Sequence, residues 1–374
     1  MNCVSPPQSE AYAGAPNIAL RFLGEQRLAH RLAFGGTIVG GLSGIDYDPD
    51  TDTFFVISDD RSDFSPARFY TATLTIAEHG FTNLALKNAI TLLRPDGTAF
   101  PSRPGLDVAD AEAIRFDRST RTLWWTSEGE RMVRGKRAKD GPRLIDPFIR
   151  QAALDGRYLG AVPLPAMFHM STERRGPRDN TVFEGTTLSD DGASLWVAME
   201  GPLLEDGPMP TTGEGALTRV SRFDRDAAGG FGALVAQYAY PIDPIPHPSI
   251  VPIIAAINSV SEILAIAPSR FLVIERSYAL GHGVSVKLFE ASTEGATDVQ
   301  AISALGPARA GAAIVPMAKR LVLDFASLGI TIDNIEGVCF GPTLANGHRT
   351  LVFVSDDNFN PRQVTQFLAF EVVQ

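Results

Sequence analysis

The chain has 374 residues, of which 44% are hydrophobic and 20% are charged, so it is long enough and apolar enough to bury a large core. Its net charge of −10 at pH 7 argues against a surface for nucleic acid or anionic membranes and suits a protein that binds cations. No stretch approaches the roughly 20 apolar residues that a membrane-spanning helix requires.

The N-terminal segment, residues 1–16, is rich in Pro, Ser, Gly and Ala, and this composition predicts a disordered leader. Cys3 precedes a polar, Pro-containing run that resembles the start of a mature bacterial lipoprotein, so Cys3 is a candidate site for a lipid anchor. The alternative is a leader without function. With an anchor or a secretion signal, the expected location is the periplasm, the cell envelope or the medium. Cys339 lies in an apolar strand and is expected to be a buried, inert thiol.

Five segments then repeat one pattern: an acidic residue near the start of an apolar strand, a turn, and a second apolar strand that ends in an acidic residue. They span 40–61, 110–130, 180–201, 258–277 and 333–358. A recurring period of this kind indicates a repeat architecture. In the first unit, two further strands follow, at 68–76 and 89–93. The sequence therefore predicts an all-β fold, a β-propeller whose blades are four-stranded antiparallel sheets.

We expect a single propeller domain over residues 17–374, with five blades favoured over six, and a monomer. The fifth unit ends with the strand 365–373 and is one strand short. The apolar segment near 18–23 is expected to complete that blade, because such closure removes exposed sheet edges. Deleting residues 17–30 should then destabilise the fold.

The recurring acidic residues are the main candidates for chemistry. At the opening position of the five units stand Ser43, Glu112, Glu184, Glu262 and Glu336, and at the closing position stand Asp59, Glu128, Glu200, Glu275 and Asp356. The first strand of each propeller blade lines the channel, so four glutamates would meet there, and carboxylates so close together need a cation or protons. Calcium is the expected cation, with magnesium second. Its predicted ligands are Glu112, Glu184, Glu262, Glu336, Asp59 and Asp356. The alternative is that these acids only cap strands.

Three basic residues are further candidates. Arg61 and Arg276 follow closing acids in the sequence. They either form ion pairs at the channel mouth or clamp the phosphate or carboxylate of a substrate. His282 lies in a loop soon after Arg276 and is a candidate acid or base, although a solvated loop histidine is the commoner case. The motifs of serine hydrolases, zinc proteases and paired cysteines are absent from the sequence.

Two segments are distinctive as motifs: Asp333-Asn-Ile-Glu-Gly337 and Val354-Ser-Asp-Asp-Asn-Phe359. With them, residues 36–372 resemble the bacterial phytase-like family named for the "esterase-like activity of phytase". The resemblance implies a β-propeller, commonly secreted or bound to the cell envelope, that hydrolyses esters. Propeller phytases bind several calcium ions in an acidic, lysine-rich cleft. The acids are present here, but the phosphate-binding lysines have no match, which counts against phytate as the substrate.

The resulting hypothesis is a metal-dependent hydrolase of phosphate or carboxylic esters that acts on a small anionic ester. The cation would polarise the scissile group and lower the pKa of a bound water. A channel glutamate, Glu336 or Glu184, would be the general base, and Arg61 and Arg276 would orient the substrate. The alternative is a non-catalytic envelope propeller that binds a ligand or a protein, with calcium serving stability alone.

Overall fold

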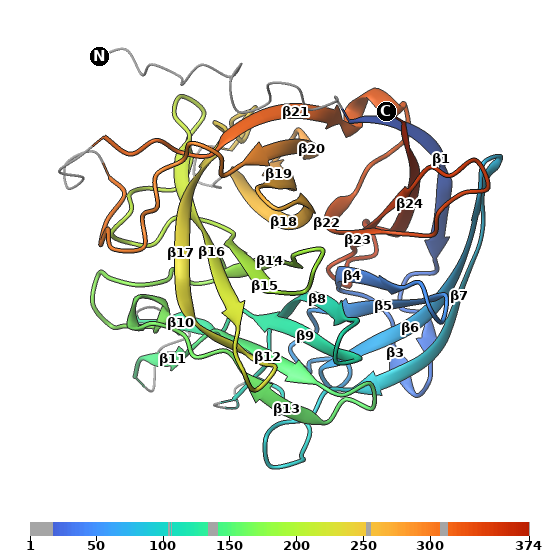
Figure 1. Cartoon of the computed structure of the whole chain (residues 1–374), viewed down its shortest axis with the longest axis horizontal. Coiled ribbons are helices and arrows are strands. Elements are labelled where there is room, and N and C mark those ends of the chain that lie inside the picture. Colours follow the sequence, from blue (N-terminus) through green and yellow to red (C-terminus); the bar gives the residue numbers. More distant parts are fainter. Residues whose placement is uncertain are drawn as a thin grey trace.

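The structure is a computed structural model, and it describes residues 18–103, 105, 107–133, 141–251, 256–306 and 313–373. These residues form five four-stranded antiparallel sheets arranged around a central axis (Figure 1). The expectation of an all-β propeller with five blades is therefore confirmed. The predicted leader and Cys3 lie outside the described residues.

Each blade consists of strands that follow one another along the chain, except that the last blade borrows its outer strand from the beginning of the chain. Blade 1 contains β4 (Leu42–Asp48), β5 (Thr53–Ser58), β6 (Arg68–Ala77) and β7 (Gly80–Thr91). Blade 2 contains β8 (Ala111–Asp117), β9 (Thr122–Ser127), β12 (Phe148–Ala152) and β13 (Tyr158–Ala161). Blade 3 contains β14 (Phe183–Leu188), β15 (Ser194–Met199), β16 (Ala216–Arg225) and β17 (Phe231–Ile242). Blade 4 contains β18 (Ile257–Ala267), β19 (Arg270–Ala279), β20 (Gly283–Ser292) and β21 (Ala318–Asp324). Blade 5 contains β22 (Asn334–Phe340), β23 (Thr350–Asp356), β24 (Thr365–Val373) and β1 (Ala19–Leu28).

The remaining regular elements are short. They are the strand pairs β2 (Ala33–Phe34) with β3 (Thr37–Ile38) and β10 (Glu130–Met132) with β11 (Arg143–Ile145), and the 3-10 turns Ala166–Phe168 and Phe325–Leu328. Across the described ranges, no helix has both the length and the apolar character that a membrane crossing would need.

The second strand of each blade is apolar on both faces because the blades pack face to face around the axis. In β5 and β9 every residue after the first is buried. Aromatic pairs join adjacent blades: Phe55 stacks on Phe116, and Trp196 meets Phe271 edge to face, with ring centroids 5.2 and 4.9 Å apart. Such pairs add roughly 0.5–1.5 kcal/mol to the burial of their surface. The expected buried state of Cys339 is also confirmed, and burial raises the pKa of its thiol.

The ring is closed by β1, which pairs with β24 along its whole length, from Ala19 opposite Val373 to Leu28 opposite Thr365. In Figure 1 the blue β1 runs beside the red β24 at the edge of blade 5. The prediction that an N-terminal strand completes the last blade is thus confirmed, and the strand is longer than the sequence suggested.

Shortening the Leu23 side chain tests how much this closure contributes to stability. Leu23 is 9% exposed in the middle of β1 and packs into the core. Leu23→Ala should lower the free energy of unfolding by about 2–3 kcal/mol, near the low end for buried leucines because the site lies at a sheet edge. Urea denaturation measures the change. Leu321→Ala in the outer strand β21, where Leu321 is 53% exposed, is the matched control and should change little. Equal stability of both variants would mean that β1 contributes no core packing.

Candidate active site at the mouth of the channel

The first strand of every blade contains a bulge, and in all blades except blade 4 the predicted opening position lies at this bulge. At this point each inner strand shifts its register against its neighbour by one extra residue or more, between Leu42 and Gly44 in blade 1 and at matching places in the others. A β-bulge turns the side chain of the extra residue out of the regular alternation. The residues at this position are Ser43, Glu112, Glu184, Ser261 and Glu336.

Blade 4 departs from the sequence-based alignment by one residue. Its bulge lies between Val260 and Glu262, so that Ser261 stands where Glu262 was predicted. At the end of the second strand, Val260 pairs with Glu275, as Leu42 pairs with Ser58 in blade 1. The residue that follows, Arg276, therefore takes the place of Asp59. The assignment of Glu262 and Glu275 to the two rings was wrong.

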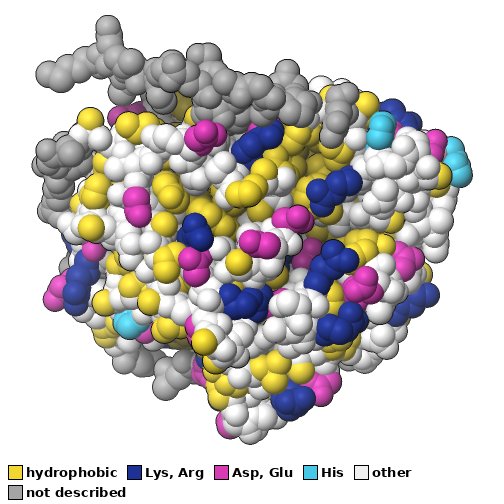
Figure 2. Space-filling view, viewed as in Figure 1, with side chains coloured by type: hydrophobic (Ala, Val, Ile, Leu, Met, Phe, Trp, Pro, Cys, Tyr) yellow, Lys and Arg dark blue, Asp and Glu magenta, His cyan; other side chains and the backbone are white. Residues whose placement is uncertain are grey.

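A cavity of about 1060 Å³ lies over these two rings of residues. Its lining includes, from the predicted set, Glu112, Glu184, Glu336, Asp59, Asp356, Arg61 and Arg276. Glu200 and Asn180 also line it. The space-filling view along the axis shows acidic and basic side chains lying close together near the centre of the face in view (Figure 2). The structure thus brings most of the predicted site residues to one cavity.

Two overlapping groups of carboxylates could hold a metal ion. The first group is Asp110, Glu112 and Glu128, and the second is Glu128, Glu184 and Glu200. Within each group, one carboxylate oxygen from every residue lies within 4.8 Å of the corresponding oxygens of the other two. The Oε2 atoms of Glu128 and Glu200 are buried and have no hydrogen-bond partner among the described residues. Leaving a buried carboxylate oxygen unsatisfied is costly, and an oxygen-rich set of this kind fits a hard cation such as calcium. The acidic cluster can therefore bind a metal ion.

Burial is the main reason why the pKa values of the acidic cluster are raised. It raises the pKa of Glu112, Glu128 and Glu184 well above the ordinary range, and the charges of neighbouring carboxylates raise these values further. Asp59 and Asp356 behave in the same way. Burial also raises the pKa of Glu336, but the nearby Arg276 opposes it, and the result is about 7.

Arg61 and Arg276 both line the cavity and pair with acidic side chains. Arg61 contacts Asp110 and the side-chain oxygen of Asn180. Arg276 lies 3.3 Å from Glu200 and 3.3 Å from Glu336 and donates to Ser261 at 3.1 Å. The ion-pair interpretation of both arginines is therefore confirmed.

Glu262 does not join the cluster but binds Arg115. The Glu262 carboxylate accepts from the Arg115 guanidinium at 2.7 Å and from the Thr186 backbone at 2.9 Å, and both side chains are buried. Arg115 also donates to the carbonyl oxygens of Ile45 and Ile263 at 2.6 and 3.2 Å. Arg115 donates as well to the carbonyl oxygen of Thr186, so its partners belong to blades 1, 3 and 4 and this one side chain links four blades. Burial raises the pKa of Glu262 to about 8, although Arg115 opposes the shift.

Two other acidic or basic candidates also lie away from the cavity floor. Glu275 accepts from Tyr240 at 2.8 Å and from Asn258 at 3.0 Å, and pairs with Lys319. His282 is exposed in the β19–β20 hairpin, where its ring stacks on His247 with centroids 4.6 Å apart. It is not among the residues that line the cavity, so the structure gives the predicted acid–base role of His282 no support.

A signal in the sequence could have placed the fourth unit correctly. The bulged residue always follows a buried apolar residue: Leu42, Ala111, Phe183, Val260 or Ile335. In the fourth unit this rule selects Ser261. In blades 1, 3 and 5 the residue after the bulge is glycine, and a Cβ on Gly185 would lie 2.6 Å from the Ile263 nitrogen, whereas blade 4 has Glu262 at this position. The predicted ligand set lacked Asp110, Glu128 and Glu200. The repeats could have indicated all three, because Glu128 and Glu200 are closing residues and Asp110 lies two residues before the opening residue Glu112.

Calcium and pH should act on stability in a linked way. Without metal, the carboxyl groups of the folded cluster keep protons that the unfolded chain has already lost. The free energy of unfolding should therefore fall as the pH rises from 5 to 7.5. This window lies between the ordinary glutamate pKa of 4.5 and the pKa of about 7 for Glu336. Calcium at a hundredfold excess over Kd should add about 2.7 kcal/mol at pH 7.5 and less at pH 5, where protons compete. Thermal melts with calcium and with chelator measure both effects.

Glu128→Gln is the informative variant for this prediction, because Glu128 belongs to both carboxylate groups. It should reduce the calcium effect and flatten the pH dependence. Glu294→Gln, at an exposed position, should leave both unchanged. A melting temperature at pH 7.5 that does not respond to calcium in the unsubstituted protein would contradict the metal assignment.

Comparison with known proteins supplies the family. The model of the phytase-like family, described as "esterase-like activity of phytase", matches residues 37–359. No curated protein matches the chain. Among solved structures, it is similar to a luciferin-regenerating enzyme, at 11% identity over 94% of this chain and 95% of that one with a TM-score of 0.37.

Two further solved structures have similar lengths. A gluconolactonase from Xanthomonas campestris is 12% identical over 96% of this chain and 99% of that one, with a TM-score of 0.35. A thermostable family-43 glycoside hydrolase is 10% identical over 90% of both chains, with a TM-score of 0.42. The family match spans the acidic repeats of all five blades and leaves out only β1 and β24 among the blade strands. The chain belongs to the phytase-like family.

Proposed function

We propose that the protein is a metal-dependent hydrolase of phosphate or carboxylic esters, with its active site in the acidic cavity at the mouth of the channel. The observation that carries this proposal is the combination of buried carboxylate oxygens without partners in Glu128 and Glu200 with two arginines beside them. Membership of the phytase-like family supports it.

The carboxylates divide into two roles. Asp110, Glu112, Glu128, Glu184 and Glu200 form the groups that can hold the cation. When bound there, the cation supplies a Lewis acid for the ester group. Glu336 lies outside both groups and contacts Arg276 instead. With a pKa of about 7, Glu336 can accept a proton near neutral pH and give it back, which makes it the best candidate for the general base.

The reaction then balances as a simple hydrolysis. A water oxygen forms a bond to the phosphorus or carbonyl carbon of the ester while its proton passes to the Glu336 carboxylate. The bond to the alcohol oxygen breaks, and the alcohol takes the proton from Glu336 as it leaves. Arg276, and Arg61 across the cavity, orient the anionic group through hydrogen bonds, for which the planar guanidinium is suited.

A substrate screen with and without calcium tests the proposal. The purified protein should hydrolyse at least one ester among nitrophenyl phosphates, phosphodiesters, short acyl esters, lactones and phytate, and chelator should abolish that turnover. If every ester is left intact while calcium still raises the melting temperature, the non-catalytic binding propeller replaces the enzyme.

A further inference from the structure

The exposed aromatic side chains gather at the cavity. Among the large hydrophobic side chains that the described part of the chain exposes, the aromatic ones are Phe64, 45% exposed, and Tyr278, 39% exposed. Both line the acidic cavity, Phe64 from the loop after β5 and Tyr278 from the end of β19. Exposed aromatic rings cost free energy in water, and aromatic side chains that line a cleft offer a contact surface for a ligand.

Phe64 belongs to a cluster of side chains at the rim. Its ring stacks on Phe359, with centroids 4.4 Å apart and an interplanar angle of 22°. The Arg31 guanidinium lies 4.6 Å from the centre of the Phe64 ring. Phe359 itself is only 9% exposed. Phe64 is thus held by the Phe359 ring and the Arg31 guanidinium and still remains 45% exposed.

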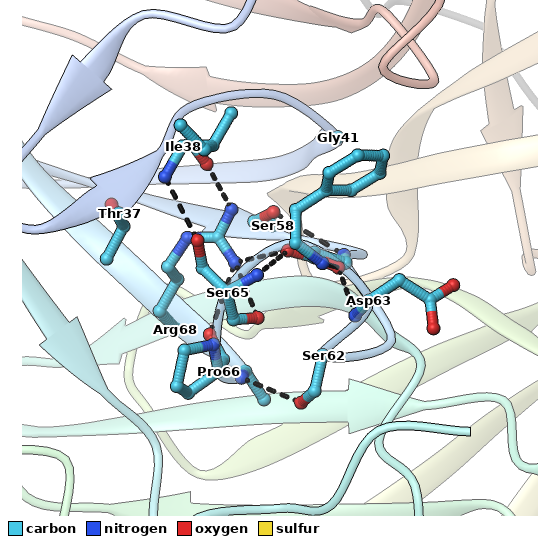
Figure 3. A network of polar contacts seen from close by, with 12 residues as sticks. Thr37, Ile38, Gly41, Ser58, Ser62, Asp63, Ser65, Pro66 and Arg68 are labelled. Carbon is cyan, nitrogen blue, oxygen red and sulfur yellow. Dashed lines mark hydrogen bonds and ion pairs between the residues drawn. The ribbon is translucent and has the colours of Figure 1, made fainter. Parts of the chain in front are cut away.

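The loop that carries Phe64 is held by a buried ion pair. Asp60 accepts from the backbone nitrogens of Asp63, Phe64 and Ser65 at 2.8, 3.1 and 2.8 Å, and from Arg68 at 2.8 Å. Figure 3 shows this network around Arg68, Ser65 and Asp63. Because both Asp60 and Arg68 are buried and satisfied, the loop is fixed before any ligand arrives.

The facing loop is held in a similar way and carries backbone strain. Asp357 accepts from the nitrogens of Gly41 and Phe359 at 3.0 and 3.1 Å. Asn358 and Phe359 have φ values of 46° and 50°, in the left-handed region that costs a non-glycine residue free energy. Such conformations persist where the surroundings impose them, and they cluster at ligand sites.

Positive charge lies next to the aromatic residues. Arg362, three residues after Phe359 in the chain, is exposed and lines the same cavity, and across the described residues its guanidinium takes part in no ion pair. Arg276 lies deeper, beside Glu336. A ligand that fits this arrangement has an apolar ring at one end for the rim and an anionic group at the other for the arginines.

Given the proposed function, on which this inference rests, we propose that the substrate is an anionic ester whose organic group carries an apolar ring. The ring contacts Phe64 and Tyr278, while the anionic ester group lies at Arg276 above the carboxylates. Phe64 and Tyr278 are then the residues that determine specificity, since they touch the part of the substrate that does not react.

Binding of non-hydrolysable phosphonates tests this inference without requiring turnover. With calcium present, calorimetry should show that phenylphosphonate binds about tenfold more tightly than methylphosphonate. Phe64→Ala with Tyr278→Ala should remove most of this preference by weakening the binding of phenylphosphonate. Leu154→Ala, at an exposed leucine that does not line the cavity, is the control and should keep the preference.

The outcomes separate this inference from the proposed function. Equal affinity for the two phosphonates, a preference that survives the double substitution, or no binding of either phosphonate would overturn the inference, even if the ester screen shows turnover. A phenyl preference that depends on Phe64 and Tyr278, together with an ester screen without turnover, would support the ring site and overturn the hydrolase.

Discussion

Replacing Glu336 with glutamine should lower kcat for the best ester of the screen by about 10²–10⁴-fold, the range that a positioned general base contributes. Glutamine has a similar shape and retains the hydrogen bond from Asn334, but it cannot accept the proton of the attacking water. In the unsubstituted protein the rate should rise with pH through about 7, because the base must be deprotonated. The glutamine variant should lose this limb of the profile. Initial rates between pH 5 and 9 measure both effects.

Glu294→Gln is the matched control for this prediction, since the same change at an exposed position should leave kcat and the pH profile as they are. Melting curves of both variants show whether the fold is intact. Full activity in a folded Glu336→Gln variant would remove Glu336 from the reaction, and the base would then have to be sought among the other cavity carboxylates, Glu184 first.

Replacing Arg115 with methionine should destabilise the fold by about 3–5 kcal/mol, the cost of removing one partner from a buried ion pair. The substitution leaves the Glu262 carboxyl without the guanidinium and takes one donor from each of the carbonyl oxygens of Ile45 and Ile263. Chemical denaturation gives the free energy of unfolding. The double variant with Glu262→Gln should be less destabilised than the sum of the two single changes, because the unpaired charge is then gone.

Arg157→Met provides the comparison, because Arg157 and its partner Asp155 are both exposed at the surface. Surface ion pairs contribute little, so this variant should unfold close to the unsubstituted protein. If Arg115→Met were equally harmless, the channel would be held by the blades alone and the buried arginine would need another explanation.

The general plan of the fold could be predicted from the sequence because each blade repeats the same physical problem. Two apolar strands must pack between neighbouring blades, and the turn between them needs residues such as Asp48, which accepts from the nitrogen of Asp50. The closure by β1 was predictable for a similar reason, since an apolar strand and a blade lacking one strand were both visible in the sequence. Such features depend on short sequence patterns, which can be recognised without knowing which residues are in contact.

The composition of the site was harder to predict because it depends on register. A shift of one residue exchanges the two faces of a strand, and in blade 4 this places Ser261 and Arg276 at the positions first given to Glu262 and Glu275. The partners of Arg115 come from three other blades, so no local pattern indicates them. His282 was chosen for its chemistry and its nearness in sequence to Arg276, and neither determines where a hairpin side chain points.

The pairing of β1 with β24 also has a consequence for how the protein is made. As the chain leaves the ribosome, β1 emerges first among the blade strands, while its partner residues from Thr365 to Val373 are synthesised after every other blade. Blades 1 to 4 can assemble in order from neighbouring hairpins, but the contact that completes the ring joins segments very far apart in sequence. Contacts of such long range form slowly. During that interval β1 is a strand without a pairing partner, and a chaperone that shields it would keep it from pairing with other chains.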